Sequence, residues 1–465
     1  MSKFKALFYP DSIAVVGAHS DPSRLGYTLV KNLKEFGYEG RVYPINPKLA
    51  GKEIFGYKFY PNLLEIPDKI DLAVIAVGAR SSLLSLKECA SKGVGSAIVL
   101  AAGFSESLTD EGRNMELEMR RISEESGMTI VGPNCLGVIS SSKKMCTFAE
   151  AEPFKGSGKI SIIFQSGSLA SSFACMSNFR GFYLNKAVST GNEAAATLND
   201  FLEYLIEDSE THVIAMYIEQ VRNGKRFIEL CNSTIKPLVA MKIGRSEMGK
   251  MAAKSHTAAL AGSIEVWNSV CRQVGVIQAE TFEELYDFSM ALASPLKPNG
   301  GNVGIVTSPG GPSVIAADFC GQFGLAVPRL KNESMDALRK MLPPFASIAN
   351  PIDMTMSALE DLNVYSKVME IVASDLNIDA LLVIAPLKHH FRIAEIVAEV
   401  VEKVEKPTVV AWTGLLDFEE LLKAMSFLGE RDIPNYYMPE RAIKAIKVMV
   451  NQTQIERAKL NNIAR

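Results

Sequence analysis

The chain has 465 residues, 48% of them hydrophobic, which predicts about three domains with ample buried cores. Its 49 basic and 52 acidic residues leave a net charge of −3. This balance gives no support to a nucleic-acid partner or to a polybasic membrane contact. The apolar stretch at the N-terminus is short and interrupted, unlike a signal peptide, and no run reaches the roughly 18 apolar residues of a membrane span.

The seven cysteines are scattered along the chain, and no two of them form a C-x-x-C pair. This arrangement indicates reduced thiols and offers no zinc or disulfide framework. No set of His, Asp and Glu residues has metal-ligand spacing either. We therefore expect a cytoplasmic protein with no metal site of its own.

Short apolar runs alternate with amphipathic stretches in the first third of the chain, which is typical of βαβ units and a parallel sheet. Helical patterns lie at Tyr27–Phe36 and Gly112–Ser126. The predicted strands of this region are Ser12–Gly17, Arg41–Ile45, Leu72–Val77, Ala97–Ala101 and Thr129–Val131.

Two Pro- and Gly-rich segments predict the domain boundaries. The first is Ala151–Gly158, after which a second βα region begins with the strand Ile160–Gln165 and ends with the helix Thr281–Ser294. The second is the linker Ser294–Asn302. We therefore predict domains at residues 1–150, 151–295 and 296–465.

The second and third regions resemble each other. Ile160–Ala174 and Val303–Ala317 both follow the pattern strand, Ser-x-Gly, helix, and later Lys236–Gly244 matches Lys406–Gly414. The similarity predicts two related open α/β domains, in which ligands bind at the carboxyl ends of the strands.

The turn after the first strand is one candidate phosphate site. The strand ends at Gly17 and a helix begins near Gly26, and the N–H groups of such a helix start bind phosphate. An insertion separates the glycines, so the turn lacks the G-x-G-x-x-G fingerprint of NAD-binding domains. An ordinary βα turn explains the pattern equally well.

Ser166-Gly167-Ser168 is a second candidate, because it lies between the strand ISIIFQ and a helix. The string is not a G-x-S-x-G nucleophile elbow. Simple capping of the helix by serine is the alternative, with about equal weight.

The loop Gly244–Ser263 is a third candidate, rich in Gly, Ala and Ser and carrying Arg245, Lys250 and Lys254 around His256. A histidine among cations on a small-residue loop suits phosphoryl carriage, because imidazole is nucleophilic near neutral pH. The alternative is a loop histidine with no chemical role.

Glu219 ends the strand THVIAMYIE. A carboxylate at the carboxyl end of a strand lies at the ligand-binding edge. There it can accept a hydrogen bond from His256 and raise the basicity of the imidazole. A solvated strand-end acid is the alternative.

Motifs of the chain follow one another in a characteristic order. They are SIAVVGA, YPINPK, DLAVIAV, AAGFSE and VGPNCLGVI, then FQSGSLA, STGNEA, KIGR and SHTAALAGS, then GGPSVIAAD and NPIDM. In this order they resemble the ADP-forming (NDP-forming) acetyl-CoA synthetase α subunits and the related succinyl-CoA synthetase α subunit. The resemblance implies an α/β fold, with a Rossmann-like CoA-binding domain followed by two flavodoxin-like doubly wound parallel-sheet domains.

The resemblance also implies roles for individual residues. His256 would be the phosphorylated histidine, with Glu219 stabilising its phosphorylated form, and Ser166 and Gly167 would face the phosphate. The acyl group would lie near Thr190, Gly191 and Asn192. The residues around CoA would be Gly17, His19, Ser20, Lys48, Val77, Glu106 and Asn134, with Lys48 near its phosphates.

By the same resemblance, the reaction would join a small carboxylic acid to CoA at the expense of ATP, giving acyl-CoA, ADP and phosphate through acyl-phosphate and phosphohistidine intermediates. The chain lacks the G-x-x-x-x-G-K-[ST] loop. ATP or ADP with Mg²⁺ would bind a separate ATP-grasp β subunit, in an α2β2 assembly.

Four positions depart from the family pattern: Gly78, Gln220, Ala258 and the pair Ser308-Pro309. Gly78 and Ala258 fit an alternative function, a non-catalytic subunit that senses CoA or acyl-CoA and in which His256 is dispensable. A nicotinamide-dependent oxidoreductase is a third possibility, and it requires the dinucleotide fingerprint that the first turn lacks.

Overall fold

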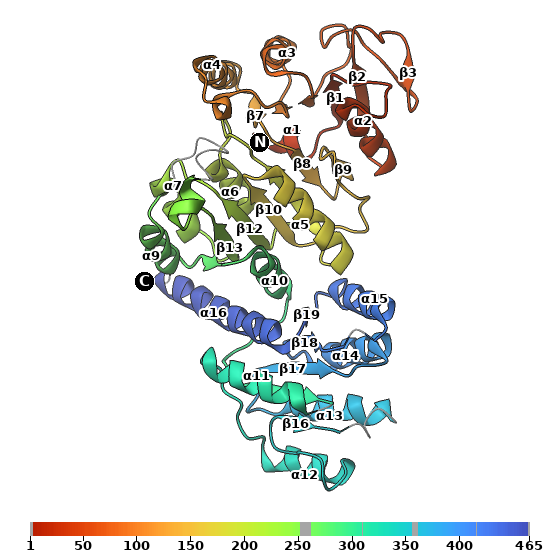
Figure 1. Cartoon of the computed structure of the whole chain (residues 1–465), viewed down its shortest axis with the longest axis vertical. Helices are drawn as coiled ribbons and strands as arrows, with labels where there is room; N and C mark the ends of the chain where they lie inside the picture. Colours follow the sequence, from red (N-terminus) through yellow and green to blue (C-terminus); the bar gives the residue numbers. More distant parts are fainter. Residues whose placement is uncertain (1–2, 252–261, 309, 356–360, 415, 464–465) are drawn as a thin grey trace. The chain divides into compact units, whose positions relative to one another are not determined.

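The computed structural model describes residues 3–251, 262–308, 310–355, 361–414 and 416–463 (Figure 1). These residues form two compact units. The first contains Met1–Asn178 and Tyr183–Phe282, and the second contains Phe179–Phe182 and Glu283–Arg465. Within the described part of the chain, no helix is both long and apolar enough to cross a membrane.

The first unit opens with a parallel sheet in the order β2-β1-β5-β6-β7. Its strands are almost wholly apolar and buried, as expected of a parallel sheet covered by helices on both faces. Alternate strand residues pack against α2 on one face and against α3 and α4 on the other. The strands are β1 (Ser12–Val16), β2 (Arg41–Ile45), β5 (Leu72–Ile75), β6 (Ser96–Val99) and β7 (Thr129–Val131), and the helices are α2 (Leu25–Glu35), α3 (Ala79–Lys92) and α4 (Asp110–Ser126).

A second sheet of the same unit has the order β14-β13-β12-β10-β11-β8-β9. Five of its strands are parallel, whereas β8 (Gly137–Ser140) and β9 (Met145–Cys146) form an antiparallel hairpin that joins the edge of the sheet at β11. The parallel strands are β10 (Ile160–Phe164), β11 (Leu184–Ser189), β12 (Val213–Ile218), β13 (Leu238–Lys242) and β14 (Ile277–Gln278).

Helices cover both faces of this second sheet. Apolar residues of α6, α7 and α9 form one core with the strands, and that core continues into the first sheet. On the other face, Phe173 of α5 meets Phe164 edge-on, with ring centroids 5.4 Å apart. The helices are α5 (Gly167–Arg180), α6 (Leu198–Glu207), α7 (Gly224–Asn232) and α9 (Ile264–Val274).

The second unit contains a third parallel sheet, in the order β16-β15-β17-β18-β19. Helices α11 and α16 lie together on one face (Figure 1), and α12 to α15 pack on the other. Helix α10 (Phe282–Ala293) is tied to α16 by a partly buried two-point ion pair between Asp287 and Arg441. The elements are β15 (Val303–Thr307), β16 (Ile352–Asp353), β17 (Ala380–Ala385), β18 (Thr408–Trp412), β19 (Asn435–Tyr437), α11 (Gly311–Gln322), α12 (Asn332–Met341), α13 (Leu362–Ser374), α14 (His390–Val404), α15 (Phe418–Gly429) and α16 (Pro439–Ile463).

The parallel strands of the three larger sheets repeat one order. Numbered along the chain within each domain, the parallel strands lie in the order 2-1-3-4-5, which is the flavodoxin-like arrangement. The predicted fold class is therefore confirmed. In this arrangement the crevice for a ligand opens at the carboxyl ends of the first and third strands, where the chain leaves in opposite directions.

Predicted and observed elements agree closely. Strands β2 and β7 have the predicted bounds, and most other ends shift by one or two residues. The predicted linker Ser294–Asn302 is the irregular segment between α10 and β15. The short elements α1 (Lys5–Phe8), β3 (Glu53–Ile54), β4 (Tyr57–Lys58), η1 (Ser105–Ser107) and β14 were not predicted, because so few residues carry no periodic signal.

Candidate active site

The residues predicted around CoA follow the carboxyl ends of the five strands in the first sheet. Gly17 follows β1, Lys48 lies just after β2, and Val77 comes soon after β5. Glu106 lies in η1, after β6, and Asn134 follows β7. Because the carboxyl ends of parallel strands meet at one edge, the structure brings these five positions to the same edge of the sheet.

The turn between β1 and α2 is tightly packed. Gly17 has a φ of +85°, which side chains rarely adopt. A Cβ on Gly26 would lie only 2.0 Å from the carbonyl oxygen of Gly17. This close approach brings the first turn of α2 onto the end of β1, and a helix start of this kind can bind an anion.

His19 and Ser20 lie in this turn. The Nδ1 atom of His19 accepts the N–H of Asp21 at 2.9 Å, which leaves its Nε2 as the proton-bearing nitrogen. Ser20 is exposed. Sequence reasoning missed Asn46, whose side chain donates to the Ala18 carbonyl.

Asn46 also accepts the backbone N–H of Lys48 at 3.0 Å. It therefore ties the segment after β2 to the turn after β1, and leaves the Lys48 side chain exposed. An Asn directly after a strand was the signal that could have identified it.

A cavity of about 390 Å³ lies at this edge, between the starts of α3 and α4. It begins next to Val77, at Gly78 and Ala79, and extends past Gly103 to Met115. Gly78 has open space around it, since a Cβ there would meet no atom within 4 Å. The departure from the family pattern at Gly78 therefore leaves the cavity wide.

The predicted acyl-binding loop contacts the turn that carries Asn134. The N–H of Asn192 donates to the Pro133 carbonyl at 2.9 Å. Gly191 has a φ of +57°, and a Cβ there would lie 2.1 Å from the same carbonyl oxygen. The two turns therefore interlock through their backbones, and only glycine fits at position 191.

Side chains complete this contact. Asn134 donates to Asn192 at 3.2 Å, and the Asn192 amide donates to the carboxylates of Glu106 and Glu116. Arg222 donates to the Asn192 carbonyl at 2.6 Å. The structure thus brings together Glu106, Asn134 and Asn192, and adds Glu116 and Arg222, which sequence reasoning missed.

Ser166 and Gly167 lie at the start of α5, after the first strand of the second sheet, and both are partly exposed. Glu219 directly follows β12, the third strand, and is buried. The two positions therefore flank the crevice of the flavodoxin-like order. Thr190 follows β11 and is buried, and its N–H donates to the Phe164 carbonyl.

Gln165 connects these positions. Its side-chain oxygen accepts the backbone N–H groups of Glu219 and Gln220 at 2.5 and 2.9 Å. Its side-chain nitrogen donates to Glu193 and to the Gln220 carbonyl, both at 2.8 Å. All of its hydrogen-bonding groups are thus engaged, which fixes the amide orientation.

Glu193 is another residue that sequence reasoning missed. One of its carboxylate oxygens accepts hydrogen bonds from Gln165, from Thr190 at 3.0 Å and from the Leu198 N–H at 3.2 Å. Burial raises the pKa of Glu193 to about 7, and these hydrogen bonds act in the opposite direction. Its place inside the STGNEA motif was the available signal.

His256 and Ala258 lie outside the described residues. The prediction that His256 is the phosphorylated residue therefore stays a prediction. N-terminal to His256, the described chain runs from the end of β13 at Lys242 to residue 251.

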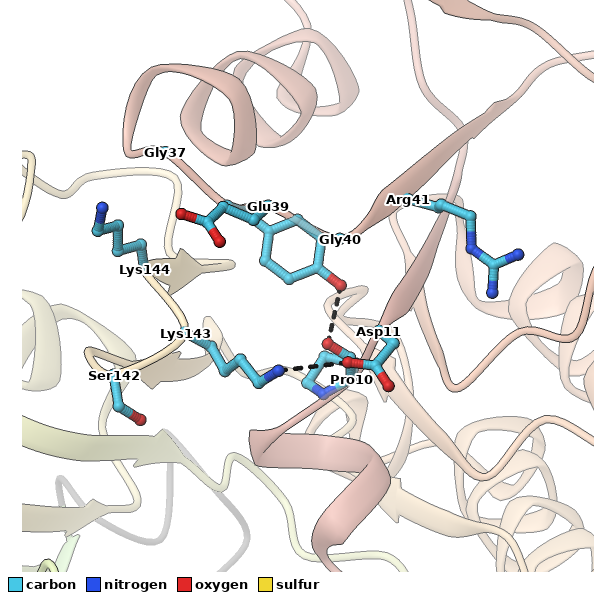
Figure 2. Close-up of a pocket in the computed structure, with 10 residues that line it drawn as sticks. Pro10, Asp11, Gly37, Glu39, Gly40, Arg41, Ser142, Lys143 and Lys144 are labelled. Atoms are coloured by element: carbon cyan, nitrogen blue, oxygen red, sulfur yellow. Dashed lines mark hydrogen bonds and ion pairs between the residues drawn. The ribbon is translucent and has the colours of Figure 1, made fainter.

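Another cavity, of about 350 Å³, lies at the opposite edge of the first sheet. Figure 2 shows Lys143, on the turn between β8 and β9, pointing toward Asp11 just before β1. Tyr38 donates to the Pro10 carbonyl beside it. This cavity lies at the amino ends of β1 and β2, and none of the predicted site residues lines it.

Among the described residues, no group of three or more His, Cys, Asp or Glu side chains is arranged to hold a metal ion. No disulfide joins the described cysteines, and all but Cys175 are buried.

Three family models match the chain in succession. A CoA binding domain matches residues 11–141, a succinyl-CoA ligase like flavodoxin domain matches residues 157–292, and a ligase-CoA domain matches residues 303–459. Together they define a CoA ligase of the succinyl-CoA ligase type.

Curated relatives agree along nearly the whole chain. The α subunit of ADP-forming acetate–CoA ligase II from Pyrococcus furiosus is 36% identical over 96% of this chain and 97% of its own length. The ADP-forming acetate–CoA ligase I of Archaeoglobus fulgidus is 37% identical over 97% of this chain, which spans 64% of that longer protein.

A solved structure shows the same fold. The dinucleotide forming acetyl-coenzyme A synthetase 1 of Ca. Korarchaeum cryptofilum, in complex with phosphate and ADP, is 30% identical and matches with a TM-score of 0.90 over the full length of both chains. The chain belongs to the family of ADP-forming acetate–CoA ligases and matches the extent of their α subunit. The predicted family is therefore confirmed.

Proposed function

We propose that this chain is the α subunit of an NDP-forming acyl-CoA synthetase. The observation that carries the proposal is the interlocking of the CoA-side turn at Pro133 and Asn134 with the acyl-side loop at Gly191 and Asn192. A thioester reaction requires the CoA sulfur and the acyl carbon to be held in one geometry. Two turns that fix each other's backbone meet that requirement.

The reaction proceeds in three steps, written toward ATP. Phosphate oxygen attacks the acyl-CoA carbonyl, the C–S bond breaks, and CoA leaves with a proton, giving acyl phosphate. An imidazole nitrogen of His256 then attacks the phosphorus, the P–O bond breaks, and the carboxylic acid leaves as carboxylate. ADP oxygen finally attacks phosphohistidine, which restores the imidazole and gives ATP.

The residues of the two edges divide these tasks. CoA contacts Gly17, His19, Ser20, Lys48, Val77, Glu106 and Asn134, and the acyl group lies near Thr190, Gly191 and Asn192. The start of α5, at Ser166 and Gly167, meets the charge on the phosphoryl oxygens. Glu219 accepts the remaining imidazole N–H of His256 and stabilises the phosphorylated form.

We further propose that the nucleotide binds a separate ATP-grasp β subunit as ATP or ADP with Mg²⁺, in a cytoplasmic α2β2 assembly. The naming of the Pyrococcus furiosus relatives as α subunits supports a partner. The proposed domains are residues 1–150 for CoA, 151–295 for the phosphohistidine and 296–465 for the second ligase domain. Light scattering of the chain mixed with the β subunit tests the assembly.

Radiolabelled phosphate tests the catalytic proposal. The chain, with the β subunit present, is incubated with labelled phosphate and a panel of acyl-CoAs beginning with acetyl-CoA, beside His256→Ala. We expect label that is acid-labile and alkali-stable in the wild-type chain and absent from the variant. Tight CoA binding without label for any acyl-CoA would overturn the proposal and indicate the CoA-sensing function instead.

A further inference from the structure

A buried lysine ends β13 beside Glu219. Lys242 is only 8% exposed, although lysine is rarely buried without a specific partner. Its Nζ atom donates to the carbonyl oxygens of Glu219 and Ile243, both at 2.7 Å. One ammonium group therefore joins the carboxyl ends of the neighbouring strands β12 and β13.

Burial disfavours the charged form of Lys242. Burial lowers the pKa of Lys242, and the negative charge of Glu219 acts in the opposite direction. Two carbonyl oxygens satisfy two of the three N–H donors. A cation kept at this edge strengthens any interaction with an anion there, because the surroundings are poorly screened.

Lys242 also ends a continuous row of polar contacts. The row crosses four neighbouring strands, in the order β11, β10, β12 and β13. Glu193 at the acyl side bonds Gln165, Gln165 bonds the Glu219 backbone, and that backbone bonds Lys242. Glu193, at the acyl-side end of the row, follows β11, whereas Lys242, at its other end, ends β13, so the two lie at different strands of the sheet.

We propose that Lys242 is a positioning residue for phosphoryl transfer: it fixes the main chain that carries Glu219 and places a positive charge beside the phosphoryl group that Glu219 serves. The inference rests on the proposed function. It separates the two halves of the reaction, because Lys242 lies at the phosphoryl end of the row and away from the acyl-binding loop. Loss of Lys242 then slows phosphorylation of His256 and spares the formation of acyl phosphate.

Lys236 lies two residues before β13 begins and provides a matched control near the opposite end of that strand. Its Nζ atom donates to the carbonyl oxygens of Leu205 and Asp208 at 3.0 and 2.5 Å. Burial lowers the pKa of Lys236 as well. The two lysines therefore make the same kind of contact, and only Lys242 lies at the edge that carries Glu219.

The experiment measures the two halves separately in the full chain with the β subunit, using the acyl-CoA that labels the wild-type chain best. Phosphate-dependent exchange of labelled CoA into acyl-CoA reports acyl-phosphate formation, and labelled phosphate on His256 reports the second step. For Lys242→Met we expect exchange within about twofold of wild type and His256 labelling slowed about 100-fold. Lys236→Met is expected to leave both rates within about twofold and only to lower thermal stability.

Each possible outcome either supports the inference about Lys242 or overturns it. Labelling of Lys242→Met at the wild-type rate, or an equal loss of exchange and labelling in a folded variant, overturns it and leaves the proposed function standing. Absence of label from the wild-type chain overturns both. If Lys242→Met does not fold, Lys242→Arg keeps the charge with a different donor geometry, and the same selective loss of labelling, in milder form, is expected from it.

Discussion

The pKa of Glu193 depends strongly on the surroundings of its side chain. It follows a glycine-containing turn, adopts a φ of 58° and directs its carboxyl group into the protein. Three hydrogen bonds reach one carboxylate oxygen, yet burial still dominates and raises the pKa of this group to about 7. The free-energy cost of removing a charged carboxylate from water exceeds the stabilisation that three hydrogen bonds provide.

This pKa predicts a pH-dependent stability. A carboxyl group with a raised folded-state pKa stabilises the fold below its unfolded value, near 4.3, and the contribution is lost as the pH rises through about 7. The shift corresponds to about 3 kcal/mol. We expect the wild-type chain to lose about that much stability relative to Glu193→Gln between about pH 5 and pH 8, measured by urea unfolding.

Glu207→Gln, at an exposed position on α6, is the control. It is expected to follow the pH profile of the wild-type chain. Parallel profiles for Glu193→Gln and the wild type would show that Glu193 is ionised in the folded chain throughout this range.

Lys186 is a second residue whose burial predicts a measurable effect. Its side chain is fully buried, and its Nζ atom lies 2.9 Å from Asp208 and 2.8 Å from Glu210. The same atom lies 5.1 Å from the centre of the Tyr9 ring. Lys186→Met would leave Asp208 buried without its cation, at a cost of about 3–5 kcal/mol.

Urea unfolding measures that cost, and the exposed Lys225→Met on α7 is its control, with an expected change below about 0.5 kcal/mol. Adding Asp208→Asn to Lys186→Met should restore part of the lost stability, because the unpaired charge is removed. A loss no greater than that of the control would mean that solvent reaches the pair.

At the scale of elements, the packing of α2 on β1 decides the shape of the turn between these two elements. Helix α2 begins with no side-chain cap on Arg24. The N–H of Tyr27 already donates to the Arg24 carbonyl, so the helix start can offer a ligand the N–H groups of Leu25 and Gly26. Gly26 allows those groups to approach the end of β1, as its contact with Gly17 shows. The affinity for CoA should therefore depend on the absence of a side chain at position 26.

We expect Gly26→Ala to raise the Kd for CoA by at least about tenfold, because the added methyl group pushes α2 away from Gly17. Isothermal titration calorimetry measures the effect. Gly224→Ala, at the start of α7, is the control, since a Cβ there meets no atom within 4 Å. An unchanged Kd for Gly26→Ala, with the circular dichroism spectrum retained, would place CoA elsewhere.

At the scale of the whole molecule, thiol reactivity reports on both compact units at once. Cysteines lie in each unit, and Cys175 is the partly exposed one among them. Burial and the negative charges of Glu152 and Glu150 raise the pKa of Cys175. Its thiol should therefore react slowly. We expect about one thiol per folded chain to react with a disulfide reagent near pH 8, and all seven after denaturation.

Cys175→Ala is expected to abolish the reaction of the folded chain. Rapid reaction of two or more thiols would show that one unit opens on the timescale of the assay.

The sequence alone determined most of the architecture. Hydrophobic runs with period two or with none mark strands, and the 3.6-residue period marks helices, so the βα order and the bounds of β2 and β7 followed from local chemistry. The family resemblance singled out Gly17, Lys48, Val77, Glu106 and Asn134, and the strand pattern places them at one edge of the sheet. Each comes after a strand, and parallel strands bring their carboxyl ends to one edge whatever their order.

Only the tertiary structure decided which distant segments meet. The hairpin of β8 and β9 precedes the predicted boundary at residue 151 and yet pairs with β11, because an edge strand carries no local signal for its partner. Gln165 reaches Glu193 and Glu219 across 28 and 54 residues. The raised pKa of Glu193 and the place of Lys242 depend on burial by neighbours far along the chain, and no local pattern encodes that burial.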